Sequence, residues 1–339
     1  MMSNRVLIVA ELSANHGGDI KIAKETIKAA KLAGADAIKI QTYTADTLTI
    51  DSNKEYFLID SGTIWDGRKL YDLYKEAYMP WEWTGILKDY SDEIGIEFFS
   101  TPFDKSAVDY LKKYDLPYYK IASFEITDIP LIRYIAKQGK PLIISTGIGT
   151  LAEIEDAVNA CRLEGNNDIY LLKCTSQYPA EVKDANLNTM LDLKRRFNVE
   201  VGVSDHSEGW IVPVAAAALG AKIIEKHFIL DKSIGGADAS FSMEPDEFKN
   251  MVNLIREVEL SLGEISYELT DKKISSRKFA RSLFIVEDVR QGQVVDEKNV
   301  RSIRPGMGLE PKNYDLVLGM KFKSNFEKGT PLQMKMLEE

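Results

Sequence analysis

The chain has 339 residues, of which 45% are apolar and 28% are charged, and its net charge is −9. This length and composition predict a globular protein with one large domain of about 250 residues and a small one. The negative charge argues against a nucleic-acid or anionic-membrane surface, so an anionic ligand would need a few local lysines or arginines. Two cysteines are too few for a disulfide framework, and the apolar run Val6–Ala10 is too short for a signal peptide or membrane span. We therefore expect a cytoplasmic protein.

From residue 6 to about residue 230, short β-branched runs alternate with segments of helical periodicity. This alternation is typical of repeated βα units around a parallel sheet. No glycine-rich dinucleotide turn follows the first run, so a closed (β/α)8 TIM barrel of the α/β class is favoured over an open sheet. The eight expected strands are Val6–Leu12, Ala37–Tyr43, Ile96–Pro102, Tyr118–Ser123, Pro141–Gly147, Ile169–Ser176, Val199–His206 and Lys222–Phe228.

Several segments depart from the repeat. Residues 45–79 are expected to form a long loop after the second strand, of the kind that covers a site. After a helix over 246–262, the polar stretch 263–280 is expected to be a linker, which leaves 1–262 as the barrel domain. Residues 281–339 are expected to form a small domain that docks on a barrel, its own or a partner's. Its expected strands are Ser282–Glu287, Val300–Arg304 and Leu332–Met336.

All three histidines fall at the expected carboxyl ends of strands, which is where TIM-barrel enzymes place their catalytic groups. His206 and His227 follow neighbouring strands and are candidate ligands for a divalent metal, with Glu11 or Asp238 near enough to join them. Manganese, magnesium, cobalt and zinc all suit such a site as Lewis acids, and the alternative is that each histidine packs a loop. His16 is equally well explained as a binding residue or as a polar group at a helix start.

Two lysines, Lys39 and Lys120, lie inside expected strands, where a cation needs an anionic partner. A bound phosphate or carboxylate would supply it. The alternatives are a Schiff-base lysine, as in aldolases, and an internal ion pair with Glu11 or Glu125. Nearby hydroxyls would complete an anion site: Thr101, Ser123, Ser176 and Ser204.

In this order, the strand-end motifs resemble the nonulosonic acid synthase family, which includes N-acetylneuraminate, legionaminate and pseudaminate synthases. The resemblance covers nearly the whole chain. Its most specific motifs are Ala10-Glu11-x-x-x-Asn15-His16, Gly34-Ala35-Asp36-x-x-Lys39-x-Gln41-Thr42, Ser100-Thr101-Pro102-Phe103, Tyr119-Lys120-Ile121, Ser204-Asp205-His206-Ser207, Glu225-Lys226-His227-Phe228 and Met243-Glu244-Pro245-Asp246. Residues 281–339, with Arg304-Pro305-Gly306-Met307-Gly308, resemble the family's small antifreeze-like (SAF) domain.

The resemblance implies a metal-dependent condensation of phosphoenolpyruvate with a sugar aldehyde, for bacterial surface or flagellar glycans, with manganese as the expected ion. It implies metal ligation by His206 and His227, and acid–base roles for Glu11, Glu125 and Asp238. It also implies a homodimer in which the small domain completes the partner's site. The residues implied to hold phosphoenolpyruvate are Lys39, Lys120, Thr101, Ser123, Ser176 and Ser204, and those implied to meet the sugar are Gln41, Tyr178, Phe124, Asp238 and Arg304.

Within the family, Ser13-Ala14, Phe124 and the segment 236–241 depart from the usual sialic acid synthase sequence and resemble pseudaminic acid synthases. An apolar side chain such as Phe124 suits a 6-deoxy diacetamido sugar better than a fully hydroxylated one. The alternatives are N-acetylneuraminate or legionaminate synthesis and, more distantly, a Schiff-base aldolase on the same barrel. A non-enzymatic alternative treats the small domain as a binding module carried on the barrel.

Overall fold

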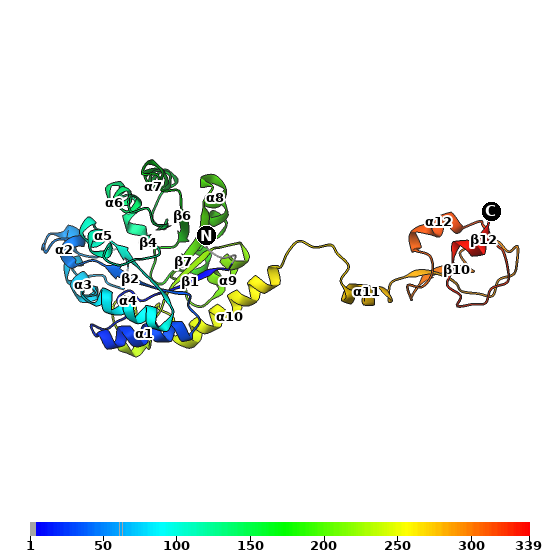
Figure 1. The fold of residues 1–339 in the computed structure, drawn as a ribbon, viewed down its shortest axis with the longest axis horizontal. Helices are drawn as coiled ribbons and strands as arrows, with labels where there is room; N and C mark the ends of the chain where they lie inside the picture. Colours follow the sequence, from blue (N-terminus) through cyan, green and yellow to red (C-terminus); the bar gives the residue numbers. More distant parts are fainter. Residues whose placement is uncertain (1–4, 61, 63) are drawn as a thin grey trace. The chain divides into compact units, whose positions relative to one another are not determined.

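The computed structural model describes residues 5–60, 62 and 64–339, which divide into two compact units, 1–263 and 264–339. The first unit is a closed barrel of eight parallel strands in sequential order (Figure 1). This confirms the predicted (β/α)8 architecture. The strands are β1 (Leu7–Glu11), β2 (Ala37–Thr42), β3 (Glu97–Pro102), β4 (Tyr119–Ile121), β5 (Leu142–Ser145), β6 (Ile169–Cys174), β7 (Glu200–Asp205) and β8 (Ile223–His227).

Helices surround the barrel (Figure 1). The first begins after Asp19, whose side chain accepts a hydrogen bond from the Lys21 amide, and it ends just before Gly34, whose φ of +95° suits glycine. The helices of this unit are α1 (Ile20–Leu32), α2 (Ala45–Leu48), α3 (Leu70–Ala77), α4 (Trp83–Ile94), α5 (Lys105–Leu111), α6 (Ile129–Ala136), α7 (Leu151–Leu163), α8 (Asn188–Phe197), α9 (Ile211–Ala218) and α10 (Pro245–Leu262). Short 3-10 helices lie at η1 (Glu55–Phe57), η2 (Ser123–Glu125), η3 (Val182–Asp184) and η4 (Lys232–Ile234).

The long connection expected over 45–79 separates β2 from α4, and it contains the short helices α2, η1 and α3. Local hydrogen bonds explain the first of these helices. The Thr44 amide donates to the Thr47 hydroxyl at 2.9 Å, which closes a capping box around residues too few to show a helical period. Positions 61 and 63 of this segment lie outside the described residues.

Side chains alternate between two faces along every barrel strand, so each second residue points into the barrel. Halfway along the barrel, six fully buried apolar side chains form one cluster that we call the barrel plug. It consists of Val9, Ala37, Phe99, Ile143, Leu172 and Ile223. The alternate residues, such as Ile8 and Ile38, join the larger core between the strands and the helices. The barrel interior is therefore packed and is not a channel.

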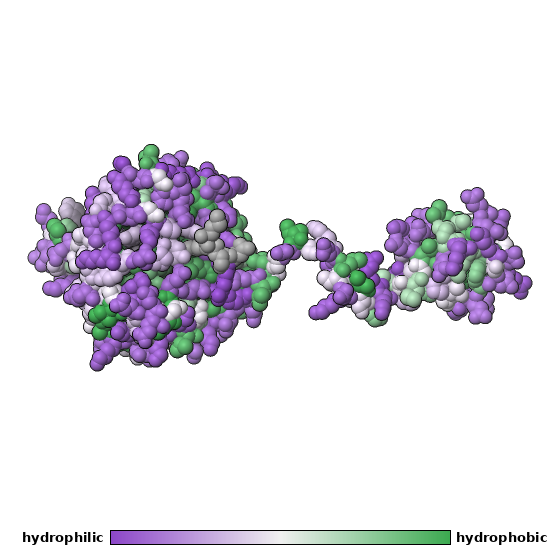
Figure 2. Space-filling model, in the orientation of Figure 1, coloured by the Kyte–Doolittle hydropathy of each residue, from purple (hydrophilic) through white to green (hydrophobic). Residues whose placement is uncertain are grey.

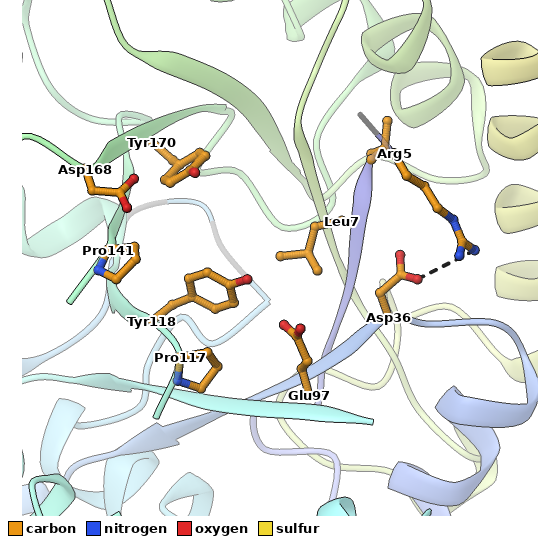
Figure 3. A pocket seen from close by; sticks show the side chains of 10 residues that line it. Arg5, Leu7, Asp36, Glu97, Pro117, Tyr118, Pro141, Asp168 and Tyr170 are labelled. Atoms are coloured by element: carbon orange, nitrogen blue, oxygen red, sulfur yellow. Dashed lines mark ion pairs between the residues drawn. The ribbon is translucent and has the colours of Figure 1, made fainter. Parts of the chain in front are cut away.

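The barrel has a cavity of about 460 Å³ at the amino-terminal ends of its strands (Figure 3). Leu7, Glu97, Tyr118 and Tyr170 point into it, and all four lie on the inward face below the barrel plug. TIM-barrel enzymes carry their chemistry at the opposite, carboxyl-terminal end of the strands. We therefore assign this cavity to the stabilising end of the barrel and not to catalysis.

The second unit has its own apolar core, which includes Leu283, Val300 and Phe322. It contains α11 (Asp271–Arg277), β9 (Ser282–Ile285), β10 (Val300–Ile303), η5 (Pro311–Asn313), α12 (Tyr314–Val317), β11 (Lys321–Phe322), η6 (Met334–Met336) and β12 (Leu337–Glu338). The strands pair antiparallel as β9 with β10 and β11 with β12.

One expectation for the second unit is wrong, and another gains detail. The expected linker over 263–280 contains a short helix, since α11 starts after Thr270, whose hydroxyl accepts a hydrogen bond from the Lys273 amide at 3.3 Å. The expected strand Leu332–Met336 is largely a 3-10 turn, and the strand pairing begins only at Leu337. Apolar side chains are exposed along α11 and the segment before it, including Ile265 and Ile274 (Figure 2).

Within the described part of the chain, no helix is both long enough and apolar enough to cross a membrane.

Candidate active site

The inward-facing residues change from apolar to polar immediately above the barrel plug. Two positions after Val9 stands Glu11, two after Ala37 stands Lys39, and two after Ile223 stands Glu225. On the other five strands, the inward-facing residue at the same level is also not apolar: Thr101 on β3, Lys120 on β4, Ser145 on β5, Cys174 on β6 and Ser204 on β7. Because all eight strands end at one rim, the polar side chains meet over the plug.

Lys39 lies at the centre of a buried charge network. Its ammonium is 2.7 Å from Glu11 Oε2 and 3.7 Å from Glu225 Oε2, and it donates a hydrogen bond to the Thr101 hydroxyl at 3.2 Å. Burial lowers the pKa of Lys39, but the Glu11 and Glu225 carboxylates outweigh burial and raise it above its usual value. Lys39 is therefore a charged ammonium, and its predicted internal ion pair is with Glu11.

Lys120 is less well neutralised than Lys39. It donates to the Ser145 hydroxyl at 2.6 Å and to the Ile121 carbonyl at 3.1 Å, and its nearest carboxylate oxygen, on Glu225, is 3.9 Å away. Burial is the largest cause of the lowered pKa of Lys120, and the Glu225 charge only partly opposes it. An anionic ligand beside this ammonium would restore its preference for the charged state.

Glu225 is a site residue that we did not single out from the sequence. It accepts a hydrogen bond from Ser204 at 2.9 Å and pairs with both buried lysines, and these charges hold its pKa below the usual value although burial opposes them. The strand-end position was visible in the sequence. Its role as a common counter-ion for Lys39 and Lys120 depends on three strands meeting, which no local pattern shows.

Two predicted hydroxyls meet beside β5. Ser176 donates to the Ser123 hydroxyl at 3.0 Å, and Ser123 also accepts from the Ile148 amide at 3.0 Å. A β-carbon on Gly147 would lie 2.2 Å from the Ser176 oxygen and 2.7 Å from the Ser123 oxygen, so only glycine leaves room for this pair. The sequence reading missed this use of Gly147. The group forms a small polar cradle of the kind that holds phosphate oxygens.

The two predicted metal ligands lie side by side. The rings of His206 and His227 have centroids 5.2 Å apart. His206 Nδ1 is 2.9 Å from the Thr175 carbonyl, which can only accept, so Nδ1 carries a proton and the neutral form of the ring offers its Nε2 lone pair to a ligand. Burial lowers the pKa of His206, but Cys174 and the Thr175 carbonyl outweigh burial and raise it, so a bound cation would displace a proton from this ring. Burial lowers the pKa of His227 well below its usual value, and the neighbouring His206 lowers it further. His227 is therefore neutral, as a metal ligand must be.

These imidazoles fit a divalent ion that takes two protein nitrogens and leaves its other positions open. His227 Nδ1 is buried without a hydrogen-bond partner, and Asp238 Oδ2 is 3.7 Å from it. Nδ1–H bonding of a ligating histidine to a backbone carbonyl, as in His206, is usual in metal sites. In the described residues no group of three or more His, Cys, Asp or Glu side chains is placed to hold an ion, so water or substrate would complete the coordination.

Aromatic rings form a wall beside the imidazole pair. The Tyr178 ring lies 4.3 Å from His206, 5.2 Å from Phe241 and 5.6 Å from Trp65, measured between centroids. The Trp65 indole donates to the Ala237 carbonyl at 3.1 Å, which joins the loop after β2 to the loop after β8. Trp65 and Phe241 were not predicted, because their places depend on loop conformations that carry no periodic signal.

The remaining predicted residues are placed as follows. Gln41 donates to Glu11 Oε1 and to the Ser13 hydroxyl, both at 2.9 Å, on the rim of the charge network. Glu125 is largely buried, and burial raises its pKa to about 7 against the opposing charge of Lys120. Phe124, beside it, is 58% exposed. Arg304 belongs to the second unit and is exposed there.

His16 does not join the other two histidines through any ring contact in the described structure. Its ring packs edge-on against Trp83 of α4 at 5.6 Å, and its Nδ1 accepts a hydrogen bond from the Gly18 amide at 3.1 Å. Of the two explanations left open by the sequence, these contacts favour the polar group at a helix start.

Comparison with known proteins agrees with this geometry. Residues 26–267 match the NeuB family and residues 280–338 match the SAF domain. The chain belongs to the NeuB family. This confirms the resemblance drawn from the strand-end motifs, and the SAF match confirms the predicted type of the small domain.

Relatives of this NeuB-family chain include two proteins named pseudaminic acid synthase. The protein from Campylobacter jejuni (strain 81-176) is 50% identical over 97% of this chain and 96% of its own length, and that from Helicobacter pylori is 44% identical over 98% and 97%. Among solved structures, the N-acetylneuraminic acid synthetase from Leptospira borgpetersenii, in complex with citrate, has a TM-score of 0.72 and 34% identity. The match covers 81% of this chain and 91% of that one.

Proposed function

We propose that the chain is a pseudaminic acid synthase, a transferase that condenses phosphoenolpyruvate with 2,4-diacetamido-2,4,6-trideoxy-L-altrose and water. The observation that carries the proposal is the meeting, on one barrel rim, of an incompletely neutralised ammonium, a hydroxyl cradle and an imidazole pair. Near-full-length similarity to two pseudaminic acid synthases supports the choice of sugar.

Each part of the rim has a task in this reaction. Lys39 and Lys120 would bind the phosphate and carboxylate of phosphoenolpyruvate, with Thr101, Ser123, Ser176 and Ser204 supplying further hydrogen bonds. In the reaction, C3 of phosphoenolpyruvate forms a bond to the sugar aldehyde carbon, a water oxygen adds to C2, and the C2–O bond breaks to release phosphate. The electron pair of that bond leaves with the phosphate oxygen.

Proton movements need groups with suitable pKa values near the reacting carbons. Glu125, with its pKa raised to about 7 by burial, would donate the proton to the aldehyde oxygen. Asp238 or Glu11 would take a proton from the attacking water. Gln41, Tyr178 and Asp238 would meet the sugar, with Phe124 at the exposed rim.

His206 and His227 would hold the divalent ion, with manganese proposed and magnesium or cobalt as alternatives. When bound, the ion supplies Lewis-acid polarisation of the aldehyde oxygen. We also propose a cytoplasmic location, since both cysteines are free and buried.

The proposal is tested by phosphate release from phosphoenolpyruvate in the presence of manganese, with three sugars compared. We expect turnover with 2,4-diacetamido-2,4,6-trideoxy-L-altrose, little with N-acetylmannosamine or 2,4-diacetamido-2,4,6-trideoxymannose, and none after a chelator is added. Preference for N-acetylmannosamine or the trideoxymannose would identify an N-acetylneuraminate or legionaminate synthase instead. Failure to release phosphate with any of the three sugars would contradict the synthase assignment.

A Schiff-base aldolase is a second candidate, because the lowered pKa of Lys120 would favour a nucleophilic amine. Borohydride added with a carbonyl substrate would then leave a covalent adduct on Lys120. We expect no such adduct, since a synthase needs this lysine as an ammonium. Turnover that resists a chelator would favour the aldolase.

We further propose a homodimer in which the SAF domain of one chain completes the partner's site through Arg304. The exposed apolar side chains around α11 would gain cover in such an assembly. Mixing Arg304→Ala chains with Lys120→Met chains tests it. If the SAF domain acts on the partner's barrel, the mixture regains activity that neither variant has alone. In a mixed dimer, the barrel of the Arg304→Ala chain still has Lys120, and the SAF domain of the Lys120→Met chain supplies Arg304 to it. Activity absent from the mixture after verified subunit exchange would contradict the swapped arrangement.

A further inference from the structure

Lys226 is a buried lysine with no place in the charge network above the barrel plug. On β8, Glu225 and His227 belong to the inward face, so the alternation places Lys226 on the outward face, toward the helices. Its side chain is 1% exposed. An ammonium is tolerated in such surroundings only when it is paired and hydrogen-bonded.

The partners of Lys226 lie on both sides of His206. The ammonium is 2.5 Å from Asp205 Oδ2 and also donates to the Ser207 carbonyl. Asp205 in turn accepts hydrogen bonds from the Ser207 amide and the Ser207 hydroxyl, each at 3.0 Å. We call Asp205, Ser207 and Lys226 the β7–β8 clamp. Asp205 and Ser207 flank His206 in the sequence, and Lys226 directly precedes His227.

The clamp acts where the sheet no longer fixes the backbone. Asp205 is the last residue of β7 and the last to pair with β8, so His206 lies beyond the strand ladder. The His206 carbonyl accepts a hydrogen bond from the Ala180 amide at 3.0 Å. This bond also fixes the position of the segment that carries Tyr178. His227, by contrast, is still paired with Glu11 of β1.

We propose that Lys226 is a positioning residue: through the β7–β8 clamp its ammonium sets the position of the His206 imidazole relative to His227 and to the Tyr178 ring. The geometric claim stands by itself, and its catalytic use rests on the proposed synthase function. Groups behind metal-ligating histidines commonly change metal affinity 10- to 100-fold when they are removed.

The test uses the fact that the chain has only three histidines. In protein labelled with 15N-histidine, each imidazole gives its own NMR signals, which single His→Gln variants assign. Lys226→Met is expected to shift or broaden the His206 and His227 signals and to leave His16, which packs against Trp83, unchanged. Asp205→Asn, which keeps the side-chain shape, is expected to move the same two signals and serves if Lys226→Met does not fold.

The matched control is Arg256→Met. It breaks another ion pair inside the barrel unit, between Arg256 Nη2 and Asp36 Oδ2 at 2.5 Å, and Asp36 lines the cavity at the opposite end of the barrel. This variant is expected to lose stability without moving the His206 or His227 signals. The proposal is overturned if the clamp variants leave both signals in place, or move them no more than Arg256→Met does.

A second readout is the affinity for Mn²⁺, measured by the electron paramagnetic resonance of free Mn²⁺ without substrate. We expect about 10- to 100-fold weaker binding in the clamp variants and unchanged binding in Arg256→Met. Equal affinity in all variants would contradict the role in metal binding. A wild-type chain that binds no Mn²⁺ would instead count against the metal in the proposed function, and the NMR comparison would still decide the clamp.

Discussion

Replacing Lys120 by methionine is expected to lower kcat/KM for phosphoenolpyruvate about 1,000-fold, which corresponds to about 4 kcal/mol. Methionine keeps the length of the side chain but removes the charge that the substrate anion would pair with. Steady-state phosphate release, with phosphoenolpyruvate varied at a saturating sugar concentration, measures the effect. Because burial already disfavours this ammonium, the thermal midpoint of the variant is expected not to fall.

The control for this experiment is Lys140→Met. Lys140 pairs with Asp115 at 2.6 Å, but both side chains are exposed, so the pair contributes about 1 kcal/mol at most and touches no predicted site residue. We expect its kcat/KM to equal that of the wild type. A Lys120→Met enzyme with an unchanged KM for phosphoenolpyruvate and an unchanged kcat would show that the anion binds elsewhere.

Glu125→Gln is expected to lower kcat by about 100- to 10,000-fold and to abolish a pH limb near 7. Burial raises the pKa of Glu125 from 4.5 to about 7, so the group is protonated below pH 7 and ionised above it. If Glu125 is the general acid, wild-type kcat falls as the pH rises through 7. A pH–rate profile from pH 5.5 to 9 in both enzymes measures this.

The same pKa shift has a consequence for stability that does not depend on catalysis. Between pH 4.5 and 7 the folded state binds the Glu125 proton and the unfolded state releases it, so rising pH lowers the free energy of unfolding. The loss reaches about 3 kcal/mol at most across this window. In urea unfolding, the free energy of unfolding is expected to decrease more between pH 5 and pH 8 for the wild type than for Glu125→Gln. Equal decreases would mean that the Glu125 carboxyl is not perturbed.

The barrel was predictable because its signal is local and repeated. Each β-branched run marks a strand, and the period of two then decides which residues face inward, so Lys39 and Lys120 could be placed in the site from the sequence. The alternation that places Glu11 above Val9 needs no tertiary information. The helix α11 was missed because a polar, charged stretch shows no apolar face, although Thr270 is an ordinary helix cap.

The contacts between strands could not be predicted in the same way. Glu225 serves both lysines, and Lys226 reaches Asp205, only because of the register between neighbouring strands. Trp65 and Phe241 reach the rim through loops whose conformations depend on the barrel beneath them. For such residues the sequence gives the residue type and the approximate place, while the partner depends on the closed structure.

The pairing of β1 with β8 bears on how the protein is made. Glu11 is synthesised well before its ladder partner His227, which lies near the end of the barrel domain. The strand that closes the barrel thus also brings Glu225 and the second imidazole. A nascent chain that stops before residue 223 has both lysines but neither Glu225 nor an imidazole pair, so the site and the closed barrel arise in the same late step of folding.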